Sequence, residues 1–385
     1  SPRPDLERDE PVRVAVVSGR GARRVRAVMG IAVALTLAGI PSSQGRPAAG
    51  SGHLVYAAMG DSYTSGPLVL PHDTTWVPED CGQSVRNYPH LAAAAIGATT
   101  FTDVSCGSAT IDDLYQPQTG LPLGGVNAPQ LDAAGPDADV VTLGMAGNDV
   151  GFVGLALGCI RLVGPPAEQP CSPAYTAGGR DRVSERIAAV GPELGKALRD
   201  IHAKAPLAQV FVVSYPTALP DNGVACWPYL PILPEDMPYL VAKYKEMNAM
   251  LAAQAAANDA TYIDIYTSSI GHDACQIPAV AWVNGMVVVP PSYPAHPNDF
   301  GLANAGRVVA AAIEQRLAAT APAVPVEPSS PNRPAPQPAS SATPAPGATL
   351  PVTGGGDRSS LAVVLLLIGA AATSLRRRAG ASVAT

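Results

Sequence analysis

The sequence predicts an α/β domain built on a parallel sheet whose two faces are both covered by helices. Short apolar runs alternate along residues 51–320 with Ala-rich stretches that have helical periodicity. The short runs are apolar throughout, and not only at every second position, which is typical of strands buried on both sides. Strands that alternate with helices in this way are joined by crossovers and therefore run parallel.

Five strands and four main helices are expected. The strands are predicted at residues 54–59, 99–104, 140–143, 210–213 and 262–265. The helices are predicted at residues 88–96, 182–202, 239–258 and, near the end of the domain, 302–317. Reactive groups in parallel sheets gather at the carboxyl ends of the strands, so the residues after each strand are the first candidates for a site.

Charge excludes one class of function. The chain has 385 residues, and 47% of them are apolar, which is enough for a large core. Residues 51–320 contain 12 Lys and Arg against 25 Asp and Glu, a net charge of −13. A domain this acidic lacks the basic surface that binds nucleic-acid backbones, so no nucleic-acid partner is expected.

The N-terminal part, residues 1–50, is predicted to be a leader that contains a secretory signal. Arg20, Arg23, Arg24 and Arg26 precede the apolar run 27–40, and small polar residues follow it. The run is shorter than the roughly 20 residues that a membrane-spanning helix needs. The Arg23-Arg24 pair is compatible with twin-arginine export, but in so basic a region it is also explained by chance.

The C-terminal part, residues 350–385, resembles the sorting signal of sortase substrates in Gram-positive bacteria. Leu-Pro-Val-Thr-Gly at 350–354 is followed by the apolar run 361–375 and by three Arg at 376–378. The resemblance implies cleavage after Thr353 and covalent attachment of Thr353 to peptidoglycan by sortase, so the membrane would be a transient partner during export. A plain membrane anchor is the alternative. Residues 321–349, rich in Pro, Ala and Ser, are predicted to be an extended linker.

Six cysteines all lie in the middle domain, which in an exported chain predicts disulfides. They are Cys81, Cys106, Cys159, Cys171, Cys226 and Cys275. Six cysteines allow 15 pairings, and pairing in sequence order is the simplest. No CxxC spacing or neighbouring His indicates a metal site, so we expect neither a metal nor another cofactor.

Four loops after predicted strands carry residues suited to ester hydrolysis. Ser62 follows the first strand in Gly-Asp-Ser, and Gly107 and Ser108 follow the second. Asn148 follows the third strand, and His296 precedes the last helix. A serine hydroxyl needs a base such as His to take its proton, and the oxyanion that forms on attack needs fixed N–H donors. Each motif alone has a structural explanation as a turn or a cap; their order along the strands is what points to a site.

Together these blocks resemble the SGNH (GDSL-type) hydrolase family, and most closely the secreted actinobacterial lipases and esterases with three sequential disulfides. The resemblance covers residues 53–318 and includes the segments 104–106, 127–131 and 147–152. It implies a flavodoxin-like three-layer α/β/α sandwich with a central parallel sheet of about five strands. It also supports the disulfides 81–106, 159–171 and 226–275.

The resemblance implies a role for each residue in the four loops. Ser62 matches the nucleophile and His296 the base, while Asn148 and the backbone N–H of Ser62 match oxyanion donors. The 107–108 backbone would supply a further donor, although Ser108 stands where the family usually has Gly. Ala146 likewise occupies a place that is often Gly.

Many members carry an Asp three residues before the His, where this chain has Tyr293. We therefore expect a Ser62–His296 dyad in which the carbonyl of Tyr293, or of a close neighbour, orients the imidazole. Asp299 is a weaker candidate for an orienting acid.

These observations predict a secreted, wall-attached, monomeric serine ester hydrolase. Because the likeness is to lipases, the expected substrate is a lipid or other fatty-acyl ester. The alternatives are a polysaccharide O-acetyl esterase and, from another class, a catalytically inert binding module or adhesin displayed on the wall. The remaining histidines lie in none of the four loops and are expected to be surface or packing residues.

Overall fold

The computed structural model describes residues 53–164, 167–286 and 288–320 of the chain. The predicted leader (1–50), linker (321–349) and sorting signal (350–385), including Thr353, lie outside the described residues. Within the described ranges, none of the helices combines the length and apolar character that crossing a bilayer would require.

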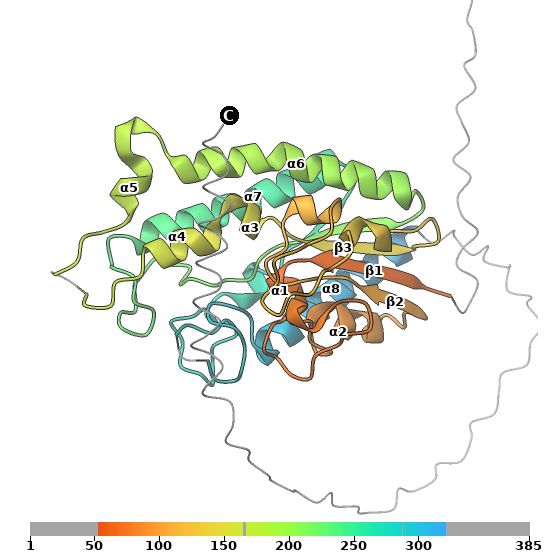
Figure 1. Ribbon diagram of the computed structural model, residues 1–385, viewed down its shortest axis with the longest axis horizontal. Coiled ribbons are helices and arrows are strands. Elements are labelled where there is room, and N and C mark those ends of the chain that lie inside the picture. Colours follow the sequence, from red (N-terminus) through yellow and green to blue (C-terminus); the bar gives the residue numbers. More distant parts are fainter. Residues whose placement is uncertain (1–52, 165–166, 287, 321–385) are drawn as a thin grey trace, which may run out of the picture. The chain divides into compact units, whose positions relative to one another are not determined.

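A single five-stranded parallel sheet forms the centre of the domain, in the order β2-β1-β3-β4-β5 (Figure 1). Its strands are β1 (Val55–Gly60), β2 (Thr100–Asp103), β3 (Val140–Gly144), β4 (Gln209–Val213) and β5 (Thr261–Ile263). All five strands predicted from the sequence are present, and each bound lies within two residues of the prediction. Strand β3 is buried along its whole length, as expected of a strand covered on both sides.

Helices cover both faces of this sheet, so the predicted three-layer α/β/α sandwich is confirmed. The α-helices are α1 (Ser62–Ser65), α2 (Tyr88–Ala95), α3 (Gly147–Val150), α4 (Phe152–Gly158), α5 (Ser172–Thr176), α6 (Arg182–Lys204), α7 (Met237–Ala257) and α8 (Asp299–Thr320). Single 3-10 turns lie at Glu79–Cys81, Ile111–Leu114, Gln130–Ala133, Ala177–Gly179 and Thr267–Ser269. The four long helices were expected, whereas α1, α3, α4 and α5 are too short to show a period in the sequence.

The two faces of β1 pack against different helices. Side chains alternate along a strand, so Tyr56 and Ala58 lie on one face and Ala57 and Met59 on the other. The face with Tyr56 packs with residues of α2 and α8 (Figure 1). The opposite face packs with residues of α6 and α7. This burial holds the sheet rigid and fixes where its carboxyl edge lies.

The sheet order places its topological switch point between the ends of β1 and β3. These strands are neighbours, and Gly60 and Gly144 pair at their carboxyl ends. After β1 the chain crosses through α2 on one face, and after β3 it crosses through α6 on the other. Crossovers that leave to opposite faces open a cleft at the strand ends, which is where α/β sheets bind ligands.

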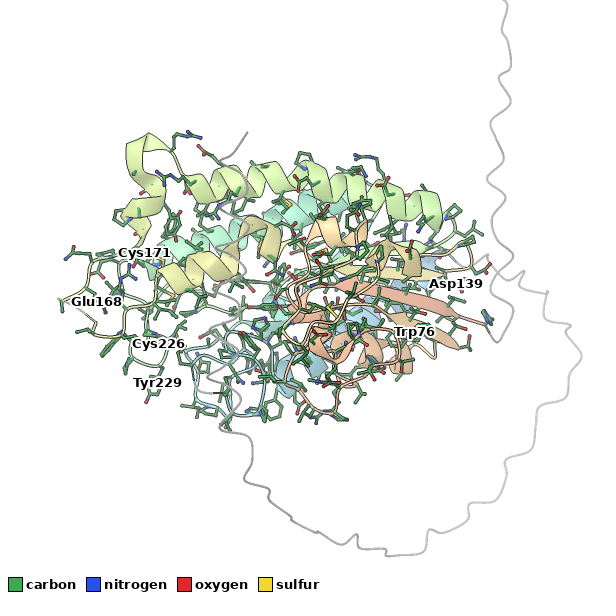
Figure 2. All side chains as sticks on the ribbon, viewed as in Figure 1. Trp76, Asp139, Glu168, Cys171, Cys226 and Tyr229 are labelled. Atoms are coloured by element: carbon green, nitrogen blue, oxygen red, sulfur yellow. A yellow bond between two sulfur atoms is a disulfide. The ribbon has the colours of Figure 1, made fainter. Side chains whose placement is uncertain are left out.

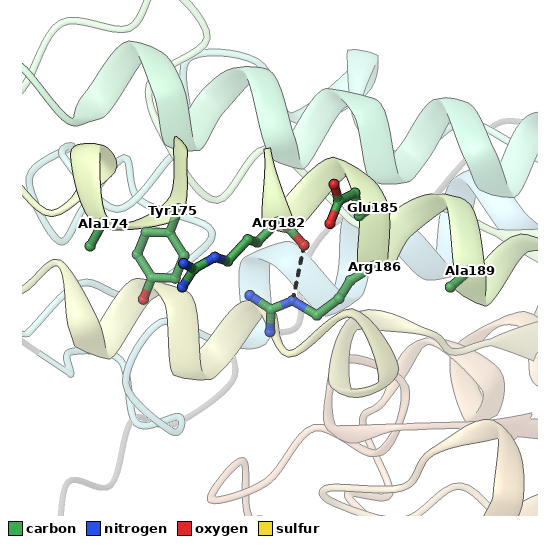
Figure 3. A pocket seen from close by; sticks show the side chains of 6 residues that line it. All are labelled: Ala174, Tyr175, Arg182, Glu185, Arg186 and Ala189. Atoms are coloured by element: carbon green, nitrogen blue, oxygen red, sulfur yellow. Dashed lines mark hydrogen bonds between the residues drawn. The ribbon is translucent and has the colours of Figure 1, made fainter. Parts of the chain in front are cut away.

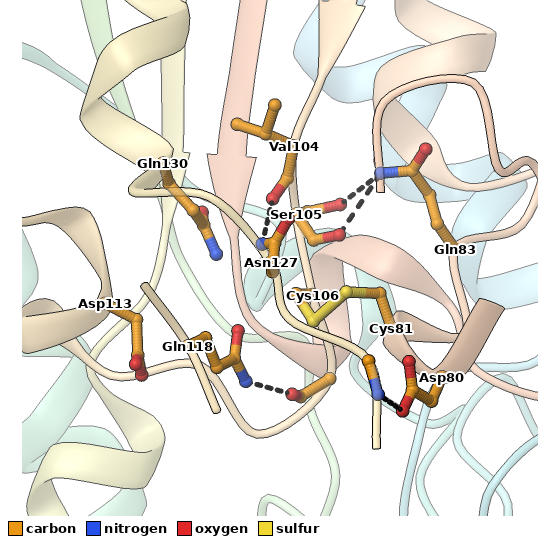
Figure 4. Close-up of a disulfide and its surroundings, with 12 residues drawn as sticks. Asp80, Cys81, Gln83, Val104, Ser105, Cys106, Asp113, Gln118, Asn127 and Gln130 are labelled. Carbon is orange, nitrogen blue, oxygen red and sulfur yellow. Dashed lines mark hydrogen bonds between the residues drawn. A yellow bond between two sulfur atoms is a disulfide. The ribbon is translucent and has the colours of Figure 1, made fainter. Parts of the chain in front are cut away.

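Three disulfides brace the loops at this edge. Cys81 bonds Cys106, Cys159 bonds Cys171, and Cys226 bonds Cys275, which is the sequential order that the sequence analysis favours. The first bond joins the loop after α1 to the loop after β2 (Figure 4). All six cysteines are therefore paired.

Candidate active site

The turn that carries Ser62 is built by the residues immediately before it. Gly60 ends β1 where an added Cβ would lie 2.7 Å from the Gly144 carbonyl oxygen, so only glycine fits. The Asp61 carboxylate caps α1 by accepting a hydrogen bond from the backbone N–H of Tyr63 at 2.9 Å. Ser62 is the first residue of α1, so its backbone N–H has no acceptor within the helix and is free to face a ligand.

His296 meets Ser62 across 234 residues of sequence. The imidazole Nε2 lies 2.7 Å from the Ser62 Oγ, and both residues are largely buried. On the other side of the ring, Nδ1 lies 2.8 Å from the carbonyl oxygen of Pro294. A carbonyl can only accept, so Nδ1 carries the hydrogen and Nε2 is left to accept the hydroxyl proton of Ser62. This is the tautomer that a general base requires.

A backbone carbonyl orients His296, as expected, but it is that of the neighbour Pro294 and not that of Tyr293 itself. The carbonyl of Tyr293 accepts instead from the backbone N–H of His296 at 3.1 Å, which closes a tight turn and points it away from the ring. The turn, in which Ala295 has φ 60°, brings the Pro294 carbonyl under Nδ1. Tyr293 packs its ring edge-on against the imidazole. Asp299 begins α8 and pairs with Arg86 at 3.0 Å, so it is not the orienting acid.

Burial sets the protonation of His296. It lowers the pKa of this imidazole to about 4, and the Pro294 carbonyl opposes the effect only in part. A carboxylate beside Nδ1 would favour the charged form, but a neutral carbonyl does so much less. The imidazole is therefore neutral near pH 7 and stays so well into the acidic range.

One of the two backbone donors expected in the loop after β2 is already engaged. The Gly107 N–H donates to the carbonyl oxygen of Cys81 at 2.9 Å, so it is not available to an oxyanion; the prediction for Gly107 is wrong. The Cys81–Cys106 bond holds these two segments together and explains why this N–H is used (Figure 4). Gln118 further fixes the loop by donating to the Gly107 carbonyl oxygen at 2.7 Å.

Ser108 and Ala146 both adopt the backbone conformation that glycine usually provides. Their φ angles are 62° and 118°. The left-handed region costs a residue with a Cβ about 1 kcal/mol. The substitutions seen in the sequence have therefore not changed the course of these loops, and Ser108 lies exposed at the turn after the Cys81–Cys106 disulfide.

Asn148 lies in α3, after β3, with its amide directed at the second loop. Its Nδ2 donates to the carbonyl oxygen of Ala109 at 2.9 Å, which uses one of the two N–H hydrogens and leaves the other. The side chain is thus held by the loop that carries Ser108. The four loops chosen from the sequence are linked at one edge of the sheet.

Two supporting residues were not assigned a role from the sequence. The Tyr215 hydroxyl donates to Asp61 Oδ2 at 2.5 Å and accepts from the Gly147 N–H at 2.7 Å, tying the Ser62 turn to α3. The side-chain amide of Gln130 pairs with both the N–H and the carbonyl of Gly60. Tyr215 follows β4, so the rule of inspecting strand ends would have found it. Burial raises the pKa of Asp61 to about 7, with the Tyr215 hydrogen bond opposing the rise.

Metal ligands are not grouped in this domain. Over residues 53–164, 167–286 and 288–320, no three His, Cys, Asp or Glu side chains are placed to share an ion. The arrangement of hydroxyl, neutral imidazole and N–H donors can carry out acyl transfer with the side chains already described.

Comparison with known proteins agrees with this chemistry. The family model for the GDSL-like lipase/acylhydrolase family matches residues 58–303. The chain belongs to this family. "Lipase 2" of Streptomyces coelicolor is 36% identical over 278 residues, which are 72% of this chain and 90% of that protein. This GDSL-family chain is therefore a carboxylic ester hydrolase, a lipase or esterase.

Solved structures have the same fold. The extracellular lipase of Streptomyces rimosus matches with a TM-score of 0.51 and 25% identity, over 67% of this chain and 99% of that one. Phospholipase A1 of Streptomyces albidoflavus matches with a TM-score of 0.52 and 23% identity, over 68% and 99%. At this identity the second match concerns the fold alone.

Proposed function

We propose that this GDSL-family hydrolase cleaves fatty-acyl esters through an acyl-Ser62 intermediate, with Ser62 and His296 acting as a dyad. The observation that carries the proposal is the 2.7 Å contact between Ser62 Oγ and a His296 whose Nδ1 is bonded to the Pro294 carbonyl. That geometry leaves Nε2 as the acceptor for the hydroxyl proton.

The proposed mechanism assigns a side chain or backbone group to each step of acylation and deacylation. Nε2 of His296 takes the Ser62 proton as Oγ attacks the ester carbonyl carbon, and the resulting imidazolium then gives that proton to the leaving alcohol. Water next attacks the acyl-Ser62 carbonyl, with His296 again accepting the proton, and the carboxylic acid leaves as Ser62 is restored. The N–H groups of Ser62 and Ser108 and the Nδ2 of Asn148 stabilise the oxyanion. Loss of one such donor costs a factor of about 10²–10³ in rate.

The test is hydrolysis of p-nitrophenyl esters from acetyl to palmitoyl by the exported chain. We expect Ser62→Ala to abolish turnover. Ser65→Ala is the matched control, because Ser65 lies in the same short helix, is buried, and its hydroxyl has no partner within the described residues. Turnover that survives Ser62→Ala would contradict the proposal. A strict preference for acetyl esters would favour the polysaccharide O-acetyl esterase over the lipase.

We propose further that the enzyme is secreted and attached to peptidoglycan through Thr353. The support is the order of Leu-Pro-Val-Thr-Gly, apolar run and Arg cluster in the sequence, together with disulfides in the domain. In a Gram-positive host with sortase, muramidase should release from the walls a form of the enzyme that ends at Thr353 and carries peptidoglycan fragments. Pro351→Ala should move it to the membrane or the medium. Equal release of both forms would favour a plain membrane anchor.

A further inference from the structure

Large apolar side chains are exposed at the end of the domain where the strands have their carboxyl ends. Six of them form a surface that we call the apolar rim: Val153, Leu157, Leu162, Val163, Trp227 and Tyr229. Between 38% and 74% of each side chain is exposed. Cys171, Cys226 and Tyr229 mark this end in Figure 2. Contiguous exposed apolar surface on a soluble domain indicates an interaction site.

The two segments that carry the rim are joined to each other. Ile160 bridges to Ile232, and the Arg161 N–H donates to the Pro231 carbonyl oxygen at 2.7 Å. The Trp227 indole N–H donates to the Arg161 carbonyl oxygen at 2.9 Å and its ring covers Gly164. The rim is therefore one surface and not a set of scattered side chains.

The same surface continues to the candidate active site. Cys226 is bonded to Cys275, and Asn284 in the following segment donates its N–H to the His296 carbonyl oxygen at 3.0 Å and accepts from the Ala295 N–H at 2.9 Å. Val283 bridges to Pro297. A partner that covers the rim would thus lie beside the loop that holds the general base.

Charge distinguishes these segments from the rest of an acidic domain. Residues 150–160, 222–234 and 274–298 contain no Asp, Glu, Lys or Arg at all. Residues 161–186 carry four Arg against three acidic residues, whereas residues 51–320 as a whole have a net charge of −13. The rim is thus an uncharged surface with a basic flank.

The basic flank is a pocket of about 590 Å³ between α5 and α6 (Figure 3). Arg182 and Arg186 project into it beside Tyr175, and neither forms a salt bridge within the described residues, although Arg182 lies close enough to Glu185 to help lower the pKa of that carboxyl. Its acidic lining residue, Glu185, is neutralised by a two-pronged pair with Arg180. The pocket borders α4, because Arg186 lies over Gly151 and the Tyr175 hydroxyl lies over Gly158.

We infer that the apolar rim and the Arg182–Arg186 pocket together dock the enzyme on an anionic phospholipid surface. Trp, Tyr and aliphatic side chains enter the boundary between headgroups and acyl chains, while Arg attracts the negative leaflet. An anionic phospholipid surface offers an apolar layer to the rim and negative headgroups to the two Arg at once, whereas the charge of an acidic second copy would match only the Arg. The inference rests on the proposed function, and it identifies a phospholipid surface as the place where the enzyme meets its acyl-ester substrates.

Vesicle co-sedimentation tests the inference with the Ser62→Ala chain, which leaves the lipids intact. The probes are vesicles of phosphatidylcholine alone and with 30% phosphatidylglycerol (about a physiological anionic fraction). We expect binding to the anionic vesicles that falls steeply as salt is raised. Adding Leu157→Ser should weaken binding about tenfold, since roughly half of a Leu side chain would no longer be buried in lipid. Arg182→Gln with Arg186→Gln should weaken it by about fivefold per Arg.

Matched control residues lie at the opposite end of the domain, near the amino ends of the strands. Leu207 is 48% exposed, against 50% for Leu157, and it lies just before β4, at the amino end of the strands. Arg199 lies in α6 beyond the pocket and has no acidic partner within the described residues. Leu207→Ser and Arg199→Gln should leave vesicle binding unchanged.

The outcomes separate this inference from the proposed function. Hydrolysis of soluble p-nitrophenyl acetate tests the dyad and should be unchanged by Leu157→Ser in the Ser62 enzyme. The docking inference is overturned if the chain binds no vesicles, if the control variants weaken binding as much as the rim variants, or if Leu157→Ser instead abolishes self-association in solution. It is supported if only the rim and pocket variants reduce binding while soluble turnover persists.

Discussion

Two histidines of this domain are hydrogen-bonded at both ring nitrogens, yet they have opposite chemistry. The ring of His90, in α2 beside β2, contacts Asn87 Oδ1 at 2.7 Å and Asp73 Oδ2 at 2.9 Å, and Asp103 lies 3.6 Å away. Both close partners are acceptors, so this site favours the doubly protonated ring, which can donate from both nitrogens. His296 has one acceptor, Pro294, and one donor, Ser62, so its ring is neutral.

The pKa values follow the partners. Burial alone would lower the pKa of His90, but Asp103 and Asp73 outweigh it and raise that pKa. Burial lowers the pKa of His296 to about 4 because no carboxylate is present to oppose it. The absence of an acid at position 293 thus lets burial keep His296 unprotonated to a lower pH than a carboxylate-paired histidine such as His90.

The largest expected difference is in turnover. His296→Gln should lower kcat/KM for p-nitrophenyl butyrate by about 10³-fold, since general-base catalysis is lost. His90→Gln should leave it within about threefold, because His90 lies outside the four loops. Activity is measured at pH 8 alongside a thermal melt, so that unfolding of either variant is detected. Equal losses in two folded variants would contradict the assignment.

The next difference is in stability. The contributions of His90 and His296 to the free energy of unfolding should change with pH in opposite directions. The raised pKa of His90 stabilises the fold below pH 6.5, and this contribution is lost as the pH rises through the folded-state value. The lowered pKa of His296 destabilises the fold as the pH falls from 6.5 toward 4, by about 2 kcal/mol at pH 5, because the unfolded chain takes up the proton first.

Chemical denaturation of both Gln variants at pH 8 and pH 5 measures this. His90→Gln should be more damaging at pH 5 than at pH 8. His296→Gln should be less damaging at pH 5 than at pH 8. The free energy of unfolding of each variant is compared with that of the parent chain at the same pH. This subtraction cancels the contributions of Asp61 and the other carboxyl groups. The same sign for both histidines would break the comparison.

Restoring an acid should make His296 resemble His90. Tyr293→Asp places a carboxylate beside the imidazole and should raise its pKa by about 1 unit, moving the acid limb of kcat/KM to higher pH. Tyr293→Asn is the neutral control of similar size and should leave the acid limb in place. An acid limb already near 6.5 in the parent enzyme would mean that burial does not control His296.

The smallest effect on stability is expected from removing one of the two carboxylates that face His90. Asp73→Asn removes one of the two carboxylates that hold the charged ring, and it should lower the free energy of unfolding by no more than about 1 kcal/mol, mainly below pH 6.5. Denaturation at pH 5 and pH 8 measures it. The exposed Asp137→Asn is the control and should change neither value.

Much of the fold and the site could be predicted because the relevant signals are side chains. The central strands β1 and β3 are apolar and buried on both faces, and Ser62, Asn148 and His296 follow or precede elements that the sequence places in order. The Pro294 carbonyl and the engaged N–H of Gly107 could not be predicted, because every residue has a carbonyl and its direction depends on the turn. Tyr215 looks like a core aromatic until its hydroxyl is placed between Asp61 and Gly147.

The use of a backbone carbonyl to orient His296 affects how mutations can change this site. A triad's carboxylate can be deleted by one codon change, and its charge can be titrated away. The oxygen of Pro294 belongs to the peptide linkage, so every amino acid encoded at that position would still supply one. No single substitution at position 294 can therefore remove the hydrogen-bond acceptor of the imidazole. Only a change in the backbone path could move it away.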